Sequence, residues 1–322
     1  MEFCTLLDRH FVLRCLALIR SLERQGTPFR LWVLCADDEA LTMFEQLAIP
    51  SVQPFSLREV EESFPELPAI KSSRGPYEYI ATVKPFLLRA VMEKLPEGAL
   101  LTYLDADLYF FDDPRVIEEE IGNGALLLTP HGFPEHLKSR EQNGVFNAGF
   151  LAVKNTEEGR RAIRWWCDRC VEWCYDRVEA GRSSNQKYLD EFPKLFTNVR
   201  IAHHPGLNLA PWNIDTHAYS WNGDRLLVDQ RPLIFYHFHG LKRLAPWLLD
   251  TGLATYHMRG SRLLSGRVYA PYLRELRACR ALLKKQIDAG QDLGSVRTRA
   301  GSPVTLGLAI ARLRRRQWLI SP

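Results

Sequence analysis

Two carboxylates one residue apart, at the end of an apolar run, are the side chains best placed to do chemistry. Asp105 and Asp107 follow the apolar segment 99–104 and precede Leu108 and Tyr109. Two carboxylates on an extended or turning backbone can both reach one hard cation, and Mn²⁺ and Mg²⁺ prefer oxygen ligands. The pattern therefore indicates a cation shared between the protein and a diphosphate, with a pair of surface acids as the alternative.

Two histidines close a late apolar segment. Residues 233–238 read as a strand that ends at His239 and Gly240, with His237 inside it. Residues two apart on a strand face the same side, so His237 and His239 lie on one face of this strand. A place in the core is one interpretation for each histidine.

The N-terminal part alternates apolar strands with amphipathic helices. This order is typical of a parallel sheet with right-handed crossovers. In such sheets, ligands bind outside the carboxyl ends of the strands, where we expect Asp105 to lie. The expected elements are strands at 3–7, 29–35 and 52–55 and helices at 11–24 and 38–48.

Further elements follow, and we expect one large α/β domain over 1–250. The segment 56–79 is punctuated by proline and reads as irregular. Other expected elements are helices at 80–95, with Pro85 inside or in the first turn, and at 157–178, and strands at 99–104, 125–129 and 148–153.

The end of the chain differs in charge from the rest. The net charge is +4, but residues 259–322 are strongly basic and residues 1–258 are mildly acidic. We expect 251–322 to be a basic, mainly helical extension, with helix over 253–290, a linker over 291–303 and a short amphipathic helix over 304–320. Its arginines could contact an anionic membrane. Nothing else in the chain suggests a nucleic-acid-binding module, so we expect no nucleic-acid partner.

Composition favours a soluble enzyme-sized protein. The 322 residues are 46% hydrophobic and 25% charged, which suits a globular fold and excludes a mostly disordered chain. No apolar run approaches the roughly 18 residues of a membrane span. The first residues lack the pattern of a secretion signal, and the 7 cysteines have no framework spacing. We therefore expect a cytoplasmic protein, in peripheral contact with the inner membrane face at most.

Two enzyme classes use such an Asp-x-Asp pair after a strand. Phosphatases of the haloacid dehalogenase type use the first aspartate as a nucleophile, usually on the first strand and before Gly or Thr. Here the motif lies far along the chain and continues with Leu108 and Tyr109. Nucleotide-sugar glycosyltransferases instead carry the motif internally, after a nucleotide-binding half.

Several motifs in order make the second interpretation specific. The chain resembles GT-A glycosyltransferases, in particular the retaining enzymes of glycosyltransferase family 8 and related bacterial transferases of surface polysaccharides. The resemblance covers about 1–247. It rests on segments 5–8, 20–22, 82–86 (Thr-Val-Lys-Pro-Phe), 103–107 (Tyr-Leu-Asp-Ala-Asp), 146–150 (Phe-Asn-Ala-Gly-Phe), 185–189 (Asn-Gln-Lys-Tyr-Leu) and 237–240 (His-Phe-His-Gly).

The resemblance implies a role for each matching residue. Asp105 and Asp107 would hold Mn²⁺ or Mg²⁺ against the diphosphate, with His237 completing the protein ligands and His239 as the rival candidate. Imidazole favours Mn²⁺ over Mg²⁺. The implied cofactor-binding residues besides the two aspartates are Asp8 at the base or ribose, Lys84 at the nucleotide, and Lys242 or Arg243 at the leaving diphosphate.

The implied catalytic residues are Asn147, Asn185 and Gln186, which would face the donor sugar and the acceptor. The family segment often reads Asp-Gln, whereas this chain reads Asn185-Gln186. An amide cannot act as a nucleophile or a general base, which disfavours double displacement through position 185. Front-face attack remains open, as do substitution by Asp190 and loss of catalysis.

The implied function is metal-dependent transfer of a sugar from a nucleoside diphosphate sugar to a hydroxyl group, with retention. UDP-sugar is the favoured donor and GDP-sugar is possible. The acceptor implied is a glycan, a lipid-linked intermediate or a surface polysaccharide. The alternatives are a non-catalytic nucleotide-sugar-binding protein and, third, a phosphatase.

Overall fold

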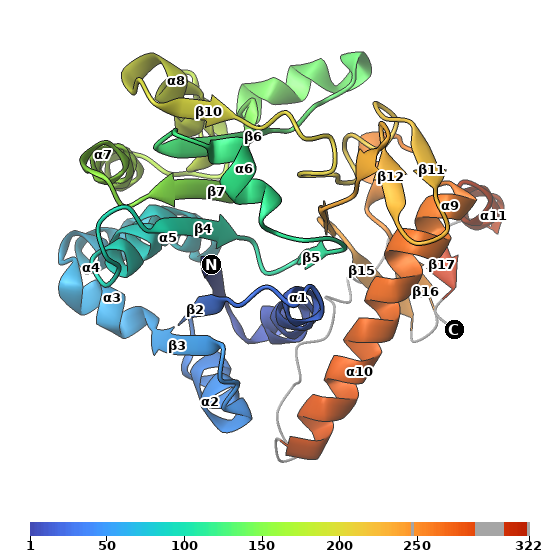
Figure 1. The fold of residues 1–322 in the computed structure, drawn as a ribbon, viewed down its shortest axis with the longest axis horizontal. Helices are drawn as coiled ribbons and strands as arrows, with labels where there is room; N and C mark the ends of the chain where they lie inside the picture. The colour runs from blue at the N-terminus through green and yellow to red at the C-terminus, as the bar shows by residue number, and fades with distance from the viewer. Residues whose placement is uncertain (246–247, 287–305, 321–322) are drawn as a thin grey trace.

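A seven-stranded mixed sheet forms the centre of the protein, in a computed structural model that describes residues 1–245, 248–286 and 306–320 (Figure 1). The strand order is β10-β6-β7-β4-β1-β2-β3. Only β7 runs antiparallel to its neighbours, which confirms the predicted mostly parallel α/β sheet. The strands are β1 (Glu2–Leu7), β2 (Arg30–Cys35), β3 (Val52–Ser56), β4 (Leu100–Leu104), β6 (Leu126–Pro130), β7 (Phe146–Lys154) and β10 (Val199–Ile201).

Helices cover both faces of this sheet. Side chains alternate along each strand, so Phe3 joins the core beneath one set of helices and Cys4 joins the core on the other face. The first core includes α1 (Val12–Arg24) and α2 (Asp38–Leu47), and the second includes α5 (Pro76–Met92) and α7 (Glu157–Glu172). The predicted order of the first five elements is thus confirmed.

The segment expected to be irregular, 56–79, is largely helical, so that prediction was wrong. It contains α3 (Leu57–Ser63), α4 (Glu66–Ile70) and a 3-10 turn, η2 (Lys71–Ser73). Ser56 and Glu59 form a capping box at the start of α3, in which the side chain of each residue accepts from the backbone amide of the other. Helix α5 begins at Pro76, so Pro85 lies in its interior and not in its first turn.

After the Asp-x-Asp motif the chain leaves the main sheet. Strand β5 (Leu108–Phe110) pairs antiparallel with β14 (Phe235–His237), the core of the strand expected over 233–238. Helix α7 ends at Glu172, earlier than expected, and a small hairpin follows, with strands β8 (Val178–Glu179) and β9 (Arg182–Ser183). The remaining elements before residue 240 are η1 (Arg9–Phe11), α6 (Val116–Ile121), η3 (Glu135–Asn143), η4 (Gln186–Glu191), α8 (Phe192–Leu195), β11 (Tyr219–Trp221), β12 (Leu226–Val228) and β13 (Arg231–Pro232).

The basic C-terminal segment packs on the rest of the protein. Helix α10 (Ala270–Gln286) lies against α1, and the buried Glu275 pairs with Arg20 at 2.9 Å and with Arg24. Before α10 come η5 (Leu253–Tyr256), α9 (Arg262–Leu264) and a π-helical turn, η6 (Ser265–Tyr269). These contacts join residues on both sides of position 250. The division of the chain into parts 1–250 and 251–322 stays a prediction.

The helix expected over 304–320 is shorter than predicted. Helix α11 spans Leu306–Arg314, and β17 (Trp318–Ile320) then pairs with β16 (Leu248–Asp250), itself paired with β15 (Lys242–Ala245). Gln317 anchors this turn through its carbonyl oxygen, which accepts from Thr251 Oγ1 at 2.7 Å. The linker expected over 291–303 lies outside the described residues. Among the helices that the structure describes, none has the length and apolar character to cross a membrane.

Candidate functional site

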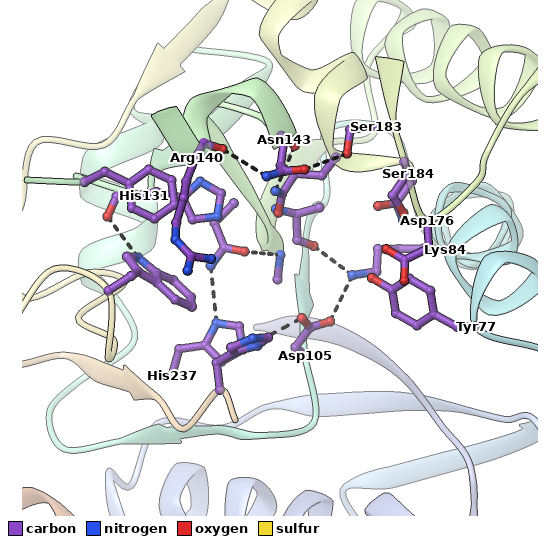
Figure 2. A pocket seen from close by; sticks show the side chains of 18 of the residues that line it. Tyr77, Lys84, Asp105, His131, Arg140, Asn143, Asp176, Ser183, Ser184 and His237 are labelled. Atoms are coloured by element: carbon purple, nitrogen blue, oxygen red, sulfur yellow. Dashed lines mark hydrogen bonds and ion pairs between the residues drawn. The ribbon is translucent and has the colours of Figure 1, made fainter. Parts of the chain in front are cut away.

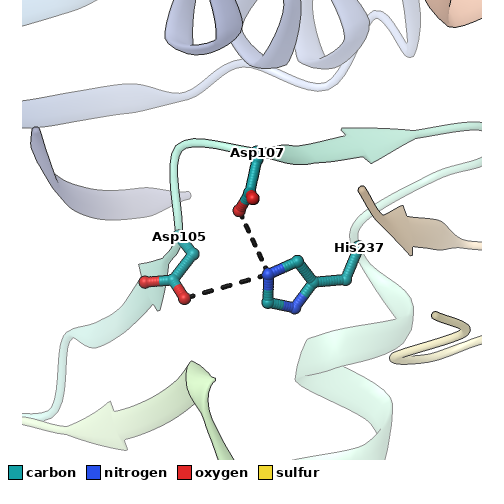
Figure 3. A group of neighbouring side chains, drawn as sticks. All are labelled: Asp105, Asp107 and His237. Atoms are coloured by element: carbon teal, nitrogen blue, oxygen red, sulfur yellow. Dashed lines mark ion pairs between the residues drawn. The ribbon is translucent and has the colours of Figure 1, made fainter. Parts of the chain in front are cut away.

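The pairing of β5 with β14 brings the predicted metal ligands together. The turn after β4 carries Asp105 and Asp107, and His237 lies opposite Leu108 in the two-stranded ladder. Nε2 of His237 is 3.1 Å from Oδ1 of Asp107 and 3.9 Å from Oδ2 of Asp105. One ligand atom from each of the three residues lies within 4.8 Å of the others (Figure 3). Two carboxylates and an imidazole suit Mn²⁺.

Asp107 is held ionised by its neighbours. Burial alone would raise the pKa of this carboxyl, but His237 and the guanidinium of Arg14 outweigh it and hold the pKa well below its usual range. Arg14 lies 3.5 Å from Oδ2 of Asp107 and donates to the carbonyl oxygen of Leu241 at 2.7 Å. Sequence reasoning missed Arg14, although an arginine within the apolar face of α1 was a usable signal.

Asp105 is oriented from its other side. Its Oδ1 accepts hydrogen bonds from Tyr103 Oη at 2.7 Å and from Lys84 Nζ at 2.9 Å. Lys84 also donates to the carbonyl oxygen of Ala148 at 3.0 Å. Oδ2 of Asp105 is therefore the oxygen that faces His237 and a cation.

Gly149 permits this close arrangement. A Cβ atom at this position would lie 2.7 Å from Oδ2 of Asp105 and 2.7 Å from Cε1 of His237. Such contacts are closer than van der Waals distance. The glycine of the Phe-Asn-Ala-Gly-Phe segment is therefore required because a Cβ atom has no room there, and not because of its backbone conformation. Its carbonyl oxygen also accepts from the amide of Asp105 at 2.8 Å, which fixes the turn.

His239 lies beside the metal-ligand group but outside it. Its ring meets the ring of His237 edge to face, with centroids 5.7 Å apart. His239 is exposed, and it does not belong to the group of three residues whose ligand atoms lie within 4.8 Å of one another. His237 is therefore the better placed of the two rivals.

A cavity of about 260 Å³ opens above these residues (Figure 2). Seven predicted site residues line it: Lys84, Asp105, Asn147, Asn185, Gln186, His237 and His239. Residues without a sequence motif complete its wall, among them Tyr77, His131, Arg140, Asp176 and Tyr256. They come from separate segments, and no sequence pattern joined them to the motifs.

The amides predicted to face the sugars are fixed in place. Asn147 donates from Nδ2 to Oδ1 of Asn208 at 2.7 Å and accepts from the amide of Gly149 at 2.9 Å. Gln186 accepts from the amide of Ala148 at 3.1 Å and donates to the carbonyl oxygen of Asn143 at 3.1 Å. Both side chains are thus held at the cavity wall before any ligand binds.

Asn185 is buried at the same wall. Its Nδ2 donates to the carbonyl oxygen of Ala81 at 2.7 Å. Asp190 does not line the cavity: its Oδ1 accepts from the amide of Val145 at 2.8 Å and its Oδ2 pairs with Lys187. The structure therefore gives no support to Asp190 as a substitute for a carboxylate at position 185.

Four predicted cofactor-binding residues lie outside the cavity wall: Asp107, which belongs to the metal-ligand group, and Asp8, Lys242 and Arg243, whose roles stay predictions. Asp8, at the carboxyl end of β1, accepts from the amide of His10 at 2.9 Å. Lys242 and Arg243 begin β15, opposite Asp250 and Leu249. Burial, and then two nearby arginines, lower the pKa of Arg243.

Two curated relatives of the chain are uncharacterized proteins of Bacillus subtilis (strain 168). YfnD is 31% identical over 279 residues, which cover 86% of this chain and 88% of YfnD. YfnF is 32% identical over 248 residues, covering 74% of this chain and 81% of YfnF. No model of a protein family matches the sequence.

Solved structures identify the fold. The galactosyltransferase LgtC, in complex with donor and acceptor sugar analogs, superposes with a TM-score of 0.53 at 17% identity, covering 86% of this chain and 96% of LgtC. An active-site mutant of LgtC gives a TM-score of 0.51 at 15% identity, covering 76% of this chain and 89% of the mutant. The chain therefore belongs to the same protein family as YfnD and YfnF and has the GT-A fold of nucleotide-sugar glycosyltransferases.

Proposed function

We propose that the protein is a metal-dependent glycosyltransferase that moves a sugar from a nucleoside diphosphate sugar, with UDP-sugar favoured, to a hydroxyl group of a glycan or glycolipid. The observation that carries this proposal is the convergence of Asp105, Asp107 and His237 at the carboxyl end of β4, in a GT-A fold. The LgtC complex supports it, since that structure contains donor and acceptor sugar analogs.

The group of two carboxylates and one imidazole fits a divalent cation. Asp105, Asp107 and His237 would hold Mn²⁺, or Mg²⁺, and a bound ion would offset the charge of the leaving diphosphate. Lys84 and Tyr103 orient the carboxylate of Asp105, and Arg14 pairs with that of Asp107. The site is thus arranged in advance of donor binding, which is what electrostatic catalysis requires.

The transfer step that suits these residues is front-face attack with retention. The acceptor hydroxyl oxygen bonds to the anomeric carbon while the bond from that carbon to the diphosphate oxygen breaks, and the hydroxyl proton passes to the diphosphate. Asn147 and Gln186 carry amides that can both donate to and accept from sugar hydroxyls. Asn185 cannot form the covalent intermediate of a double displacement.

The basic C-terminal segment supports a peripheral contact with an anionic membrane, where a lipid-linked acceptor would reside. Ile310 and Ile320 are exposed apolar side chains in a segment that also holds Arg314, Arg315 and Arg316. Apolar and cationic side chains together favour the interface of an anionic bilayer. Flotation with vesicles of anionic and of neutral lipid would test this contact.

Nucleotide binding is the first test of the function. The melting temperature is measured with UDP, GDP, CDP and dTDP, with and without Mn²⁺, for the wild type and for the Asp105→Ala/Asp107→Ala variant. A ligand at a hundredfold excess over its dissociation constant stabilises the fold by about 2.7 kcal/mol. We expect a Mn²⁺-dependent shift with UDP that the variant lacks. No shift with any nucleotide in either condition would overturn the proposal and favour the phosphatase.

Turnover separates an enzyme from a binding protein. With the nucleotide identified, release of the nucleoside diphosphate from its sugar conjugates is followed, and the anomeric configuration of the product is read by NMR. Retention is expected. Nucleotide binding without turnover on any acceptor would support the non-catalytic alternative.

A further inference from the structure

Arg140 places an unpaired guanidinium on the cavity wall. It belongs to η3 and is half-buried, and within the part of the chain that the structure describes it forms no ion pair with a carboxylate. One nitrogen, Nη2, donates to the carbonyl oxygen of Thr255 at 2.9 Å. The guanidinium carbon lies 4.8 Å from the ring centroid of Tyr256. These contacts fix the group and leave most of its five N–H donors for a ligand.

The other cation of the wall is already used. Lys84 is bonded to Asp105 and to the carbonyl oxygen of Ala148, so its charge serves the metal-ligand group. Arg140 comes from a different segment and approaches the cavity from another side than Lys84 and Tyr77 (Figure 2). Among the described residues no carboxylate pairs with Arg140, so its charge is available to a bound molecule.

The neighbours of Arg140 place it on the sugar side of the cavity. Asn143, one helical turn further along η3, donates to the carbonyl oxygen of Arg140 at 3.3 Å. The carbonyl oxygen of Asn143 in turn accepts from Gln186, one of the amides proposed to bind sugar hydroxyls. Arg140 and Gln186 are thus held by the same residue.

We propose that Arg140 binds an anionic group, a carboxylate or a phosphate, on one of the two saccharides of the reaction, so that the enzyme selects an acidic sugar. This inference rests on the proposed function. A guanidinium fork matches both anions and binds either with two parallel hydrogen bonds. The anion is on the donor sugar or on the acceptor, and the experiment separates these sources.

The donor arm compares UDP, UDP-glucose, UDP-galactose, UDP-glucuronate and UDP-galacturonate, each with Mn²⁺, by calorimetry. If the first nucleotide test selects another base, its conjugates replace these. The acceptor arm measures transfer to neutral methyl hexosides, to the matching methyl hexuronides and to hexoside 6-phosphates. Both arms use the full chain as wild type, Arg140→Met and Arg140→Lys, with Lys138→Met as the control for charge loss on the same segment.

In one arm, we expect the wild type to prefer the acidic ligand over its neutral counterpart by roughly 10- to 100-fold. Arg140→Met removes this preference while the affinity for UDP alone stays unchanged, and Arg140→Lys keeps part of it. Lys138→Met behaves as the wild type. The readout is the ratio of the affinity or transfer rate for the acidic ligand to that for its neutral counterpart. A general loss of stability would not change this ratio.

Two results would overturn the inference. One is an equal loss of affinity for UDP alone in Arg140→Met, which would assign Arg140 to the diphosphate. The other is a wild type without acidic preference in either arm. Failure of the wild type to bind any nucleoside diphosphate is a different result, because it removes the proposed function itself.

Discussion

Asn185 replaces a missing backbone donor: its Nδ2 hydrogen bonds to the carbonyl oxygen of Ala81 at 2.7 Å. Ala81 lies in α5 four residues before Pro85, which has no N–H and cannot make the usual helical bond to that oxygen. An ionised carboxylate could not fill this place, because it has no hydrogen to donate. The departure from Asp-Gln at positions 185 and 186 therefore has a structural cause.

We expect Asn185→Asp to destabilise the protein by about 1–3 kcal/mol without raising transferase activity. The ionised side chain would face the carbonyl oxygen of Ala81, whereas a protonated carboxyl can donate to it. The loss of stability relative to the wild type should therefore be smaller at pH 5 than at pH 7. Urea unfolding at pH 5 and pH 7, with turnover measured alongside, checks both statements. A gain in turnover would instead mean that Asn185 marks lost catalysis.

Lys84→Met should weaken metal-dependent nucleotide binding by roughly 10- to 100-fold, as expected for loss of an outer partner of a metal ligand. The substitution removes the 2.9 Å bond to Oδ1 of Asp105 and its counter-charge. Tyr103→Phe removes the other bond to the same oxygen without changing the charge and should cost less. Titration with Mn²⁺ and UDP measures both. An equal effect of the two variants would contradict a role for the charge of Lys84.

Gly149→Ala should abolish metal-dependent nucleotide binding while leaving most of the fold. The added methyl group would lie 2.7 Å from atoms of Asp105 and His237 and push them apart. Gly266→Ala is the control, because a Cβ there meets no atom within 4 Å. Circular dichroism and the UDP thermal shift separate folding from binding. A normal Mn²⁺-dependent shift in Gly149→Ala would place the cation elsewhere.

The sequence predicted the sheet and the position of the candidate metal ligands because both follow from local patterns. Apolar alternation located β1 to β4, and the end of β4 located Asp105 and Asp107. What it missed depends on distant partners. Strand β17 exists through its pairing with β16, about seventy residues earlier in the chain. Arg140 joins the cavity only because Thr255 and Tyr256 meet it there.

The free energy of unfolding should decrease as the pH is lowered below about 6.5, in part because of His131. Burial, and then the neighbouring His237 and His239, lower the pKa of His131 to about 3 in the folded protein. Its Nδ1 lies 3.1 Å from the carbonyl oxygen of Val145, to which the neutral ring donates. An unfolded histidine has a pKa of about 6.5. Below that pH the unfolded chain binds a proton that the folded protein does not, which favours unfolding.

Each pH unit between about 6 and 3 should therefore cost about 1 kcal/mol through this residue. We expect His131→Gln to lower stability at pH 7 but to lose less than the wild type between pH 7 and pH 5. Free energies of unfolding are measured in urea with a chelator present. They give the difference between the variant and the wild type at pH 7, and the change of each protein between pH 7 and pH 5. The exposed His136 provides the control, since His136→Gln should keep the slope of the wild type. An unchanged slope in His131→Gln would show that His131 takes up a proton in the folded state.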